Sequence, residues 1–273
     1  MTIAADEARI RAMKTYNSAA DAYDDPANSF WERFGRITVQ RLRLRSGANV
    51  LDVCCGSGAS ALPAAEIVGP SGSVLGIDLA DRLLENARAK AAARGLGNVQ
   101  FCMGDMLDLP ISDDQFDAVI CVFGIFFVPD MSQALRLLWE RVRPGGKLAI
   151  TTWGPRFFEP ATSAFWSAIQ RERPDLYKGF NPWDRICDPA SLGALFVNAG
   201  IANPEISAEP DRHSISSPEA WWAAALGSGY RGTLDQLDAA TRERVRAENF
   251  EFIRNSGITS VEANVIYAIA EKI

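Results

Sequence analysis

A short apolar run breaks into a glycine-rich turn at Val50-Leu51-Asp52-Val53-Cys54-Cys55-Gly56-Ser57-Gly58. We interpret the run as a buried strand, and the turn as a place where bare backbone approaches a nucleotide-like ligand before a helix begins. Two classes of nucleotide fit this pattern. Residues 56–61 also read as Gly-x-Gly-x-x-Ala with Asp78 about twenty residues further on, which formally satisfies a dinucleotide fingerprint. Other parts of the chain must separate the two classes.

Apolar runs rich in β-branched residues alternate with helical patterns between residue 49 and residue 153. This alternation is typical of parallel βαβ units. The predicted strands are 48–53, 73–77, 99–103, 117–122 and 147–152, and the predicted helices between them are 58–68, 80–93 and 131–142. We therefore predict an α/β fold with a seven-stranded, mostly parallel, doubly wound sheet whose last strand is antiparallel.

The regular alternation stops after Trp153 and gives way to two insertions, residues 154–187 and 216–257, which we predict to be helical. A helix over 189–199, a strand around 204–213 and a final strand over 261–270 complete the predicted elements. Most of the tryptophans lie outside the alternating block. We expect the insertions to cover the sheet as a lid, with these tryptophans either in its core or lining a pocket.

The composition narrows the possible partners and compartments. A net charge of −6 and an isoelectric point near 5.0 argue against a nucleic-acid partner, which normally needs clustered Lys and Arg. Five cysteines without a C-x-x-C pair favour a reducing compartment over a disulfide framework, and no cluster has the spacing of metal ligands. The chain shows neither a signal-peptide pattern nor a membrane-spanning apolar stretch. We expect a soluble cytoplasmic protein with a small-molecule partner and no metal; the sequence specifies no oligomeric state.

Three acids fall at the ends of three successive predicted strands, at Asp52, Asp78 and Asp105. Because the carboxyl ends of neighbouring parallel strands face one crevice, we expect the three carboxylates to converge on one ligand. Asp78 can accept hydrogen bonds from two ribose hydroxyls, and Asp105 can accept one from an exocyclic adenine amine. Leu79 and Met106 offer apolar faces for the adenine ring. The pattern therefore predicts an adenosine site.

Asp52 separates the two nucleotide classes. A dinucleotide would place its pyrophosphate on the glycine amides, where a nearby carboxylate is a like charge. An acid just before Gly56 suits instead a ligand whose distal end is cationic, such as S-adenosylmethionine with its ammonium and sulfonium groups. The alternative role for Asp52 is a structural acid that caps the amides of its own turn. The competing function is that of an NAD-dependent oxidoreductase.

Together these segments resemble the S-adenosylmethionine-dependent methyltransferases of the Rossmann-like class. The resemblance is carried by residues 50–58, Gly76-Ile77-Asp78-Leu79, Gly104-Asp105-Met106, Phe116-Asp117-Ala118-Val119 and Arg143-Pro144-Gly145-Gly146-Lys147-Leu148. It implies transfer of a methyl group from S-adenosylmethionine to a small molecule, with S-adenosylhomocysteine as product. The family commonly has glycine at the position of Cys54, so this side chain is a departure near the methionine end of the cofactor.

The resemblance implies roles for individual residues. Gly56 and Gly58 would let backbone approach the methionine part, Asp78 would bind the ribose and Asp105 the adenine amine. The residues implied in cofactor binding are Tyr23, Asp52, Cys54, Gly56, Ser57, Gly58, Asp78, Leu79, Gly104, Asp105, Met106, Cys121, Val122 and Phe123. A non-catalytic S-adenosylmethionine-binding regulatory domain would need the same set, and it remains a further alternative.

The N-terminal segment Tyr16-Asn17-Ser18-Ala19-Ala20-Asp21-Ala22-Tyr23-Asp24 is similar to the first element of methyltransferases of the ubiquinone and menaquinone biosynthesis group, in which an aromatic helix closes over the cofactor. Ordinary packing of a helix on the sheet would give the same spacing of Tyr16 and Tyr23. Quinone C-methylating members tend to have Gly-Leu-Arg-Asn-Val where this chain has Gly124-Ile125-Phe126-Phe127-Val128. The loss of the polar pair makes a quinone acceptor less favoured and the pocket wall apolar.

We therefore expect a largely apolar or aromatic acceptor in a pocket formed by Tyr16, Trp31, Phe126, Phe127 and Trp153. The single histidine, His213, could accept a proton near neutral pH, and a capping or exposed histidine is the other interpretation. In-line displacement needs mainly alignment and exclusion of water. We expect one domain over 1–273, with 1–46 as a helical lid, 47–153 as the cofactor-binding core, and 154–187 and 216–257 forming the acceptor pocket.

Overall fold

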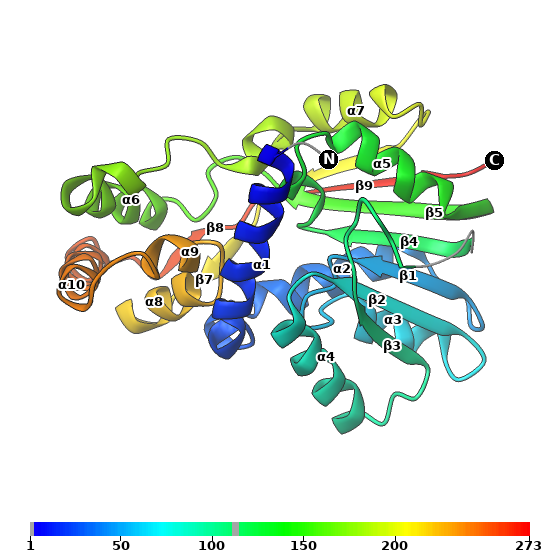
Figure 1. Ribbon diagram of the computed structural model, residues 1–273, viewed down its shortest axis with the longest axis horizontal. Coiled ribbons are helices and arrows are strands. Elements are labelled where there is room, and N and C mark those ends of the chain that lie inside the picture. The colour runs from blue at the N-terminus through cyan, green and yellow to red at the C-terminus, as the bar shows by residue number, and fades with distance from the viewer. Residues whose placement is uncertain (1–2, 111–114) are drawn as a thin grey trace.

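The structure, a computed structural model, describes residues 3–110 and 115–273. Its centre is a seven-stranded sheet with the strand order β3-β2-β1-β4-β5-β9-β6 (Figure 1). The strands are β1 (Asn49–Val53), β2 (Ser73–Asp78), β3 (Val99–Met103), β4 (Phe116–Val122), β5 (Val142–Trp153), β6 (Glu205–Glu209) and β9 (Val265–Glu271). Strands β1 to β5 pair in parallel, and β9 runs antiparallel to both of its neighbours. The predicted sheet with an antiparallel last strand is confirmed.

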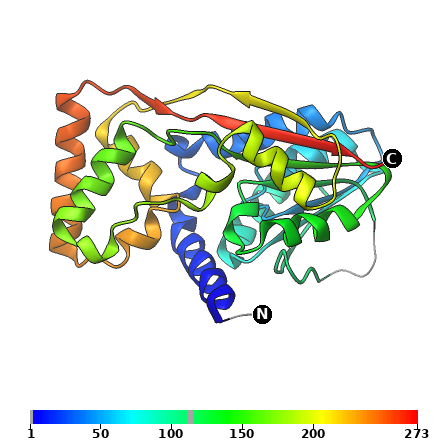
Figure 2. The ribbon, with the colours of Figure 1, turned by 90° about the horizontal axis from the view of Figure 1, so that it is seen from above.

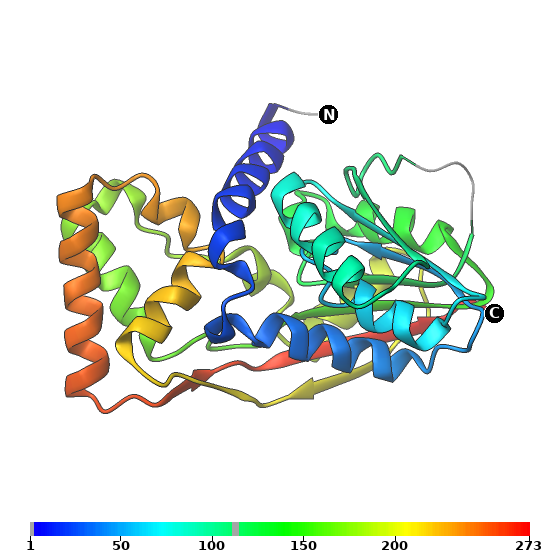
Figure 3. The ribbon, with the colours of Figure 1, turned by 90° about the horizontal axis from the view of Figure 1, so that it is seen from below.

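Helices cover both faces of the sheet, so the fold is doubly wound as predicted. The view from below shows α2 (Phe30–Leu42), α3 (Ala61–Val68) and α4 (Asp81–Ala93) over one face (Figure 3). The view from above shows α5 (Met131–Glu140) and α7 (Pro189–Asn198) over the other (Figure 2). Spacing explains this packing, because in α4 the buried residues Leu83, Leu84, Ala87 and Ala91 recur every three or four positions.

The chain reverses its direction across the sheet between β1 and β4. From β1 it builds outward through β2 to β3, and it then returns to place β4 on the other side of β1. Leu51 pairs with Leu75 on one side and with Val119 on the other, which brings the ends of the three strands to one level. The loops after β1 and β4 therefore diverge and leave a crevice at the carboxyl ends of the strands.

A helical layer lies beyond the carboxyl ends of the strands (Figure 1). It contains α6 (Ala161–Glu172), α8 (Pro218–Leu226), α9 (Arg231–Leu234) and α10 (Ala239–Asn255). Helix α1 (Ile3–Tyr23) stands between this layer and the sheet, and it contacts α4, α8 and α9 (Figures 1 and 3). Short 3-10 helices connect the parts: η1 (Pro26–Asn28), η2 (Ile125–Phe127), η3 (Pro174–Leu176) and η4 (Pro182–Ile186).

Three predicted elements have different boundaries in the structure. The helix predicted over 58–68 begins only at Ala61, because Gly58 has a φ of 87°, outside the helical region. The strand predicted around 204–213 is divided into β6 and β7 (Arg212–Ser214), and the strand predicted over 261–270 into β8 (Ser260–Glu262) and β9. Strands β7 and β8 pair with each other in a separate sheet.

The division of these two strands has a local cause. Pro210 carries no N–H for the sheet ladder, and the Asn264 side chain accepts a hydrogen bond from the backbone N–H of Asp211 at 3.1 Å. The backbone carbonyl of Asn264 in turn accepts from the N–H of Gly154 at 2.7 Å. The two chain segments therefore leave the central sheet at this point, and they continue as the β7–β8 pair toward the helical layer (Figure 2).

Candidate active site

A cavity lies in the crevice at the carboxyl ends of β1 to β4, under α1. It is lined by most of the residues predicted to bind the cofactor, namely Tyr23, Cys54, Gly56, Asp78, Leu79, Gly104, Asp105, Met106, Val122 and Phe123. Helix α1 adds Arg9, Ala12 and Met13, which the sequence analysis missed. They lie on the same face of the helix as Tyr16 and Tyr23, at three- and four-residue spacing. The helical periodicity of the N-terminal segment could therefore have predicted them.

Asp78, the last residue of β2, ties the glycine turn to the start of α4. Its Oδ2 accepts a hydrogen bond from the Gly56 N–H and its Oδ1 accepts one from the Ala80 N–H, both at 2.8 Å. Burial raises the pKa of this carboxyl. A carboxylate has about four acceptor positions, so acceptor capacity remains for hydroxyl donors in the cavity.

Asp105 follows β3 and is held from two sides. Its Oδ1 accepts from the Leu107 N–H at 2.9 Å, and its Oδ2 lies 3.3 Å from Nη1 of Arg9 on α1. The side chain of Met106 is buried beside it, and Leu79 lines the same cavity. The site thus combines an acceptor at a strand end with apolar side chains, which is suitable for a flat ring that carries an amine.

The turn after β1 adopts left-handed backbone at Cys54, with a φ of 60°, and at Gly56, with a φ of 53°. A Cβ at Gly56 would meet the Tyr23 hydroxyl oxygen at 3.1 Å, so glycine there keeps the cavity open below Tyr23. Cys54 occupies this conformation with a side chain, although glycine adopts it at lower cost. Its thiol is hydrogen-bonded to Cys121, and this contact, together with burial, raises the pKa of Cys54.

The structure corrects the role predicted for Asp52. The side chain is fully buried and does not line the cavity. Its Oδ2 accepts a hydrogen bond from the Ser60 hydroxyl at 2.7 Å, below the glycine turn. Burial raises the pKa of Asp52 to about 7. The carboxyl therefore braces its own turn, as the alternative interpretation held, and is not placed to meet a ligand cation.

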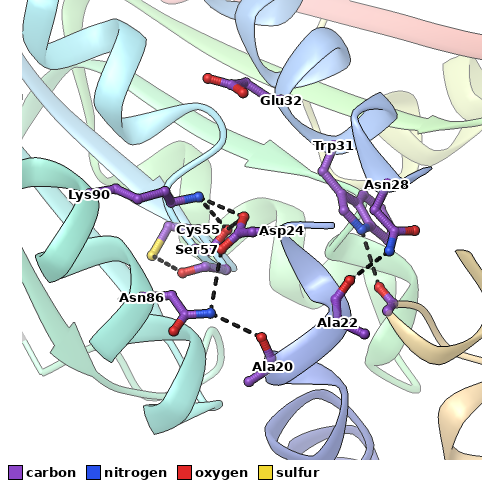
Figure 4. Close-up of polar contacts among 12 residues, drawn as sticks. Ala20, Ala22, Asp24, Asn28, Trp31, Glu32, Cys55, Ser57, Asn86 and Lys90 are labelled. Carbon is purple, nitrogen blue, oxygen red and sulfur yellow. Dashed lines mark hydrogen bonds and ion pairs between the residues drawn. The ribbon is translucent and has the colours of Figure 1, made fainter. Parts of the chain in front are cut away.

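Three other residues predicted for the cofactor also lie outside the cavity. The hydroxyl of Ser57 donates to Asp24 at 2.7 Å and accepts from Nζ of Lys90 at 2.8 Å, while Lys90 also donates to Asp24 (Figure 4). This network fastens the end of α1 to the turn and to α4. Gly58 packs against Leu62, and Cys121 is fully buried. Ser57, Gly58 and Cys121 therefore stabilise the turn and its surroundings without lining the cavity.

A second cavity of about 500 Å³ lies between the sheet, α1 and the helical layer, within the usual size range of small-molecule pockets. All five residues predicted for the acceptor line it: Tyr16, Trp31, Phe126, Phe127 and Trp153. Aromatic residues of the insertions that the sequence analysis did not assign complete it, namely Phe157, Trp166, Phe180, Trp183 and Tyr230. Trp221 and Trp222 are instead buried in the helical layer.

The two cavities share a wall. Tyr16, Trp31, Phe123, Phe127 and Val128 line both of them. The Phe123 and Trp153 rings are stacked, with centroids 4.0 Å apart and planes inclined by 12°, and they form a flat apolar floor. Burial, with the charge of Asp78 nearby, raises the pKa of Tyr16, so its phenol stays protonated at neutral pH.

His213 lines neither cavity, so its predicted role as a proton acceptor is wrong in position. Its Nε2 lies 2.7 Å from the Ala27 carbonyl oxygen, and its ring packs edge-on against Phe30 with centroids 5.0 Å apart. Burial lowers the pKa of His213, which keeps the ring neutral. This histidine therefore joins β7 to η1, and its place in a tight structural contact could not be read from its isolated position in the sequence.

Two further observations bear on ligand classes. Across residues 3–110 and 115–273, no helix combines the length and apolarity needed to cross a membrane. Among the same residues, no group of three or more His, Cys, Asp or Glu side chains is arranged to hold a metal ion.

Similarity to known proteins agrees with the geometry. Residues 50–146 match the family model described as a methyltransferase domain. The chain is 40% identical over 184 residues to the demethylmenaquinone methyltransferase of Listeria monocytogenes serotype 4a, an alignment that covers 62% of this chain and 76% of the relative. The demethylmenaquinone methyltransferase of Geobacillus kaustophilus is 38% identical over 121 residues, covering 44% of this chain and 52% of that protein.

Solved structures share the fold. An S-adenosylmethionine-dependent methyltransferase from Aquifex aeolicus superimposes with a TM-score of 0.54 at 23% identity, covering 69% of this chain and 89% of that one. These similarities decide between the two nucleotide classes and against the oxidoreductase alternative. The chain belongs to the Rossmann-like class of S-adenosylmethionine-dependent methyltransferases and is related to the ubiquinone and menaquinone group.

Proposed function

We propose that this methyltransferase acts on a small aromatic molecule, with a hydroquinone-type ring, bound in the second cavity. The observation that carries the proposal is that Tyr16, Trp31, Phe123 and Phe127 line both a cavity with strand-end acids and an aromatic cavity, so that the two adjoin. Because the two cavities adjoin at these side chains, an acceptor atom in the second cavity could lie directly in line with the methyl group held in the first. The relatives named demethylmenaquinone methyltransferase support a ring of this class.

The residues of the first cavity fit the cofactor. Asp78 keeps acceptor capacity for ribose hydroxyls, and Asp105 has room for one more donor, such as the adenine amine. Gly56 leaves space where a Cβ would close on Tyr23. We propose as cofactor-binding residues Tyr23, Cys54, Gly56, Asp78, Leu79, Gly104, Asp105, Met106, Val122 and Phe123.

When bound, S-adenosylmethionine would supply a methyl group that its sulfonium activates. The leaving group is the neutral thioether of S-adenosylhomocysteine. The protein's part is alignment and exclusion of water, which in well-oriented systems contributes about 7–11 kcal/mol. The stacked rings of Phe123 and Trp153 would hold an aromatic ring flat against the shared wall. The protonated Tyr16 hydroxyl can donate a hydrogen bond to an oxygen of that ring and so fix its rotation.

The wall also favours an apolar ring over the quinone of the relatives. Phe126 and Phe127 form η2 and line the second cavity at the positions where quinone C-methylating enzymes tend to have Arg-Asn. Their rings offer no donors to a quinone oxygen. We therefore propose a simple phenol or hydroquinone ring as acceptor, oriented chiefly by stacking.

The same proposal assigns the parts of the chain and its surroundings. Residues 1–46 act as the lid, 47–153 as the cofactor core, and 154–187 with 216–257 as the acceptor pocket. All five cysteines are free thiols, which suits the reducing cytoplasm, and the net charge of −6 suits a small-molecule partner better than nucleic acid.

A tritium-transfer assay tests this function. The full chain is mixed with S-adenosylmethionine labelled in the methyl group and with reduced naphthohydroquinone, and label is counted in the organic extract. We expect transfer that saturates with the hydroquinone and falls at least about tenfold in Asp78→Asn, because one ribose contact to a charged acceptor is worth 1.5–3 kcal/mol.

The exposed substitution Lys14→Gln on α1 serves as the matched control and should leave transfer unchanged. Binding of S-adenosylhomocysteine without label transfer to naphthohydroquinone or to a panel of simple phenols would contradict the proposed acceptor class.

A further inference from the structure

The second cavity carries a charge opposite to that of the whole protein. Its lining includes three cationic side chains, Arg11, Lys178 and Arg185, and within the described part of the chain no Asp or Glu lines it. The complete sequence has 34 acidic residues against 28 basic ones. A chance sample of this surface would therefore bring acids as well. The cavity instead combines aromatic walls with exclusively positive charge.

The guanidinium of Arg185 is already engaged, because it donates hydrogen bonds to backbone carbonyls. It donates to the backbone carbonyls of Pro129 at 3.3 Å, of Val128 and Pro182 at 3.4 Å, and of Phe126 at 3.5 Å. These bonds tie η4 to the loop after β4. Arg185 thus shapes the wall and adds positive potential, while the groups available to a ligand lie elsewhere.

Arg11 and Lys178 are the two available cations. They come from distant segments, α1 and the loop after η3, and both line the second cavity. Neither forms an ion pair with a carboxylate among the residues that the structure describes. Lys178 instead places its Nζ 5.7 Å from the centroid of the Trp166 ring, where the ammonium meets the aromatic wall.

The two cations also repel each other. Burial against the aromatic wall lowers the pKa of Lys178, and the charge of Arg11 lowers it further. Two like charges at one cavity mouth without a counter-ion are unfavourable, and an anion between them would remove this cost.

The position of Arg11 on α1 sets the distance between the anionic group of the ligand and the methylated atom. It precedes Tyr16 by five residues on the same helix, which corresponds to about 7–8 Å along the helix axis. Tyr16 lines both cavities and so marks where they adjoin and where transfer would take place, whereas Arg11 lines only the second cavity. The anionic group would therefore lie about one fused ring system away from the methylated atom.

We propose that the second cavity recognises an aromatic acid, whose ring lies against Phe123 and Trp153 and whose carboxylate is bound between Arg11 and Lys178. The inference rests on the proposed function for the identity of the acceptor cavity, and it adds the chemical class of the acceptor. It makes Arg11 and Lys178 specificity-determining residues that do not touch the reacting atoms.

Matched probes test the carboxylate directly. Hydroxynaphthoic acid and its methyl ester are titrated calorimetrically into the full chain saturated with S-adenosylhomocysteine. We expect the acid to bind at least about tenfold more tightly than the ester. Added salt should weaken binding of the acid and leave that of the ester unchanged, because salt screens the charge pairs at the exposed cavity mouth.

Variants assign the effect to the two residues. Arg11→Gln and Lys178→Gln should each weaken acid binding about fivefold to tenfold and leave ester binding within twofold. Lys14→Gln removes the same charge from an exposed position of α1 that lines neither cavity, and it should change nothing. Thermal unfolding of each variant checks that the fold is retained.

The proposal is overturned if the acid has no advantage over the ester, or if Lys14→Gln costs as much acid affinity as Lys178→Gln. Either result can occur while label transfer to neutral naphthohydroquinone persists, and the proposed function then stands without this inference. Loss of label transfer to every aromatic probe would instead count against the proposed function itself.

Discussion

The guanidinium of Arg9 on α1 lies 3.3 Å from Oδ2 of Asp105, the acid that follows β3. This contact closes the first cavity between the N-terminal helix and the sheet, beside the face that Tyr16 and Tyr23 present. The Arg9 side chain is 41% exposed, so the ion pair itself contributes little to stability, about 0–1 kcal/mol. The ion pair instead positions α1, because it holds the helix against the same carboxylate that we propose to bind the adenine amine.

Asp105→Asn should exchange the base preference of the cofactor site. The amide offers one acceptor and a donor where the carboxylate had only acceptors, so we expect S-adenosylhomocysteine to bind about tenfold more weakly. The hypoxanthine analogue, which carries a carbonyl in place of the amine, should lose less affinity or gain some. Calorimetric titration of both ligands into both proteins measures this. Equal losses for the two analogues would mean that Asp105 does not contact the amine.

Tyr16→Phe should affect turnover more than cofactor binding. It removes the hydroxyl and keeps the edge-on ring contacts with Tyr23 and Phe127, whose centroids lie 6.3 and 5.6 Å away. Loss of one neutral hydrogen bond to the acceptor predicts a fall in kcat of about threefold to tenfold. Binding of S-adenosylhomocysteine should stay within twofold. Tyr16→Ala should weaken both, because it opens the shared wall, and unchanged kcat in Tyr16→Phe would remove the hydroxyl from acceptor orientation.

Cys54→Gly should be tolerated although Cys54 is partly buried. Its left-handed conformation costs a side-chain-bearing residue about 1–2 kcal/mol, which offsets the contacts that the thiol makes. We expect thermal stability close to that of the native protein and no loss of S-adenosylhomocysteine affinity. Cys55→Gly is the matched comparison, because Cys55 is buried without a positive φ and should lose stability clearly. A larger loss in Cys54→Gly than in Cys55→Gly would contradict this account.

His213→Gln separates a structural histidine from a catalytic one. The ring is neutral and bonded to the Ala27 carbonyl, outside both cavities, so kcat/KM for label transfer should stay within about twofold while the melting temperature falls. Because its pKa is lowered in the folded state, His213 contributes stability that is present above pH 6.5 and lost as pH falls through the folded pKa. The variant should therefore lose less stability than the native protein between pH 7 and pH 5. A selective loss of kcat would restore the catalytic assignment.

The parallel half of the fold was predictable because its signals are local. Each strand there is an apolar run, and turns such as Gly69-Pro70-Ser71-Gly72 interrupt the pattern where the chain reverses. The division of the antiparallel strands into β6 and β7 and into β8 and β9 was not predictable. The break at Pro210 depends on Asn264, which lies more than fifty residues later in the chain and contacts Asp211 only in the folded state. Local patterns do not record which distant segment supplies a hydrogen bond.

The site was predictable to the same extent. Asp78 and Asp105 stand at strand ends, where topology alone directs them into the crevice. Asp52 lies within a strand whose side chains alternate between faces, so that Val53 lines the cavity while its neighbour turns to Ser60 beneath the turn. The aromatic residues of the insertions could be counted from the sequence, but their cavity face depends on how the helices pack.

Asp52→Asn tests the buried carboxyl through the pH dependence of stability. The pKa of Asp52 is raised to about 7 in the folded protein by burial, against an ordinary value of 3.8. The folded state therefore binds the proton more tightly than the unfolded chain, and the contribution of Asp52 to stability is full below pH 3.8 and lost as pH rises through 7. The asparagine has no such dependence. The melting temperature of Asp52→Asn relative to the native protein should rise from pH 4 to pH 7 and level off above pH 7, by roughly 2–4 °C for each kcal/mol involved.

The Ser60→Ala variant provides a control of opposite direction. The Ser60 hydroxyl donates to Asp52 and favours its ionised form, so that its removal should raise the pKa further and extend the loss of stability toward pH 8. Differential scanning calorimetry of the three proteins across this range measures both slopes. A pH-independent difference between Asp52→Asn and the native protein would show that Asp52 is ionised throughout, and the carboxylate beneath the glycine turn would then need a positive partner that the present geometry does not give it.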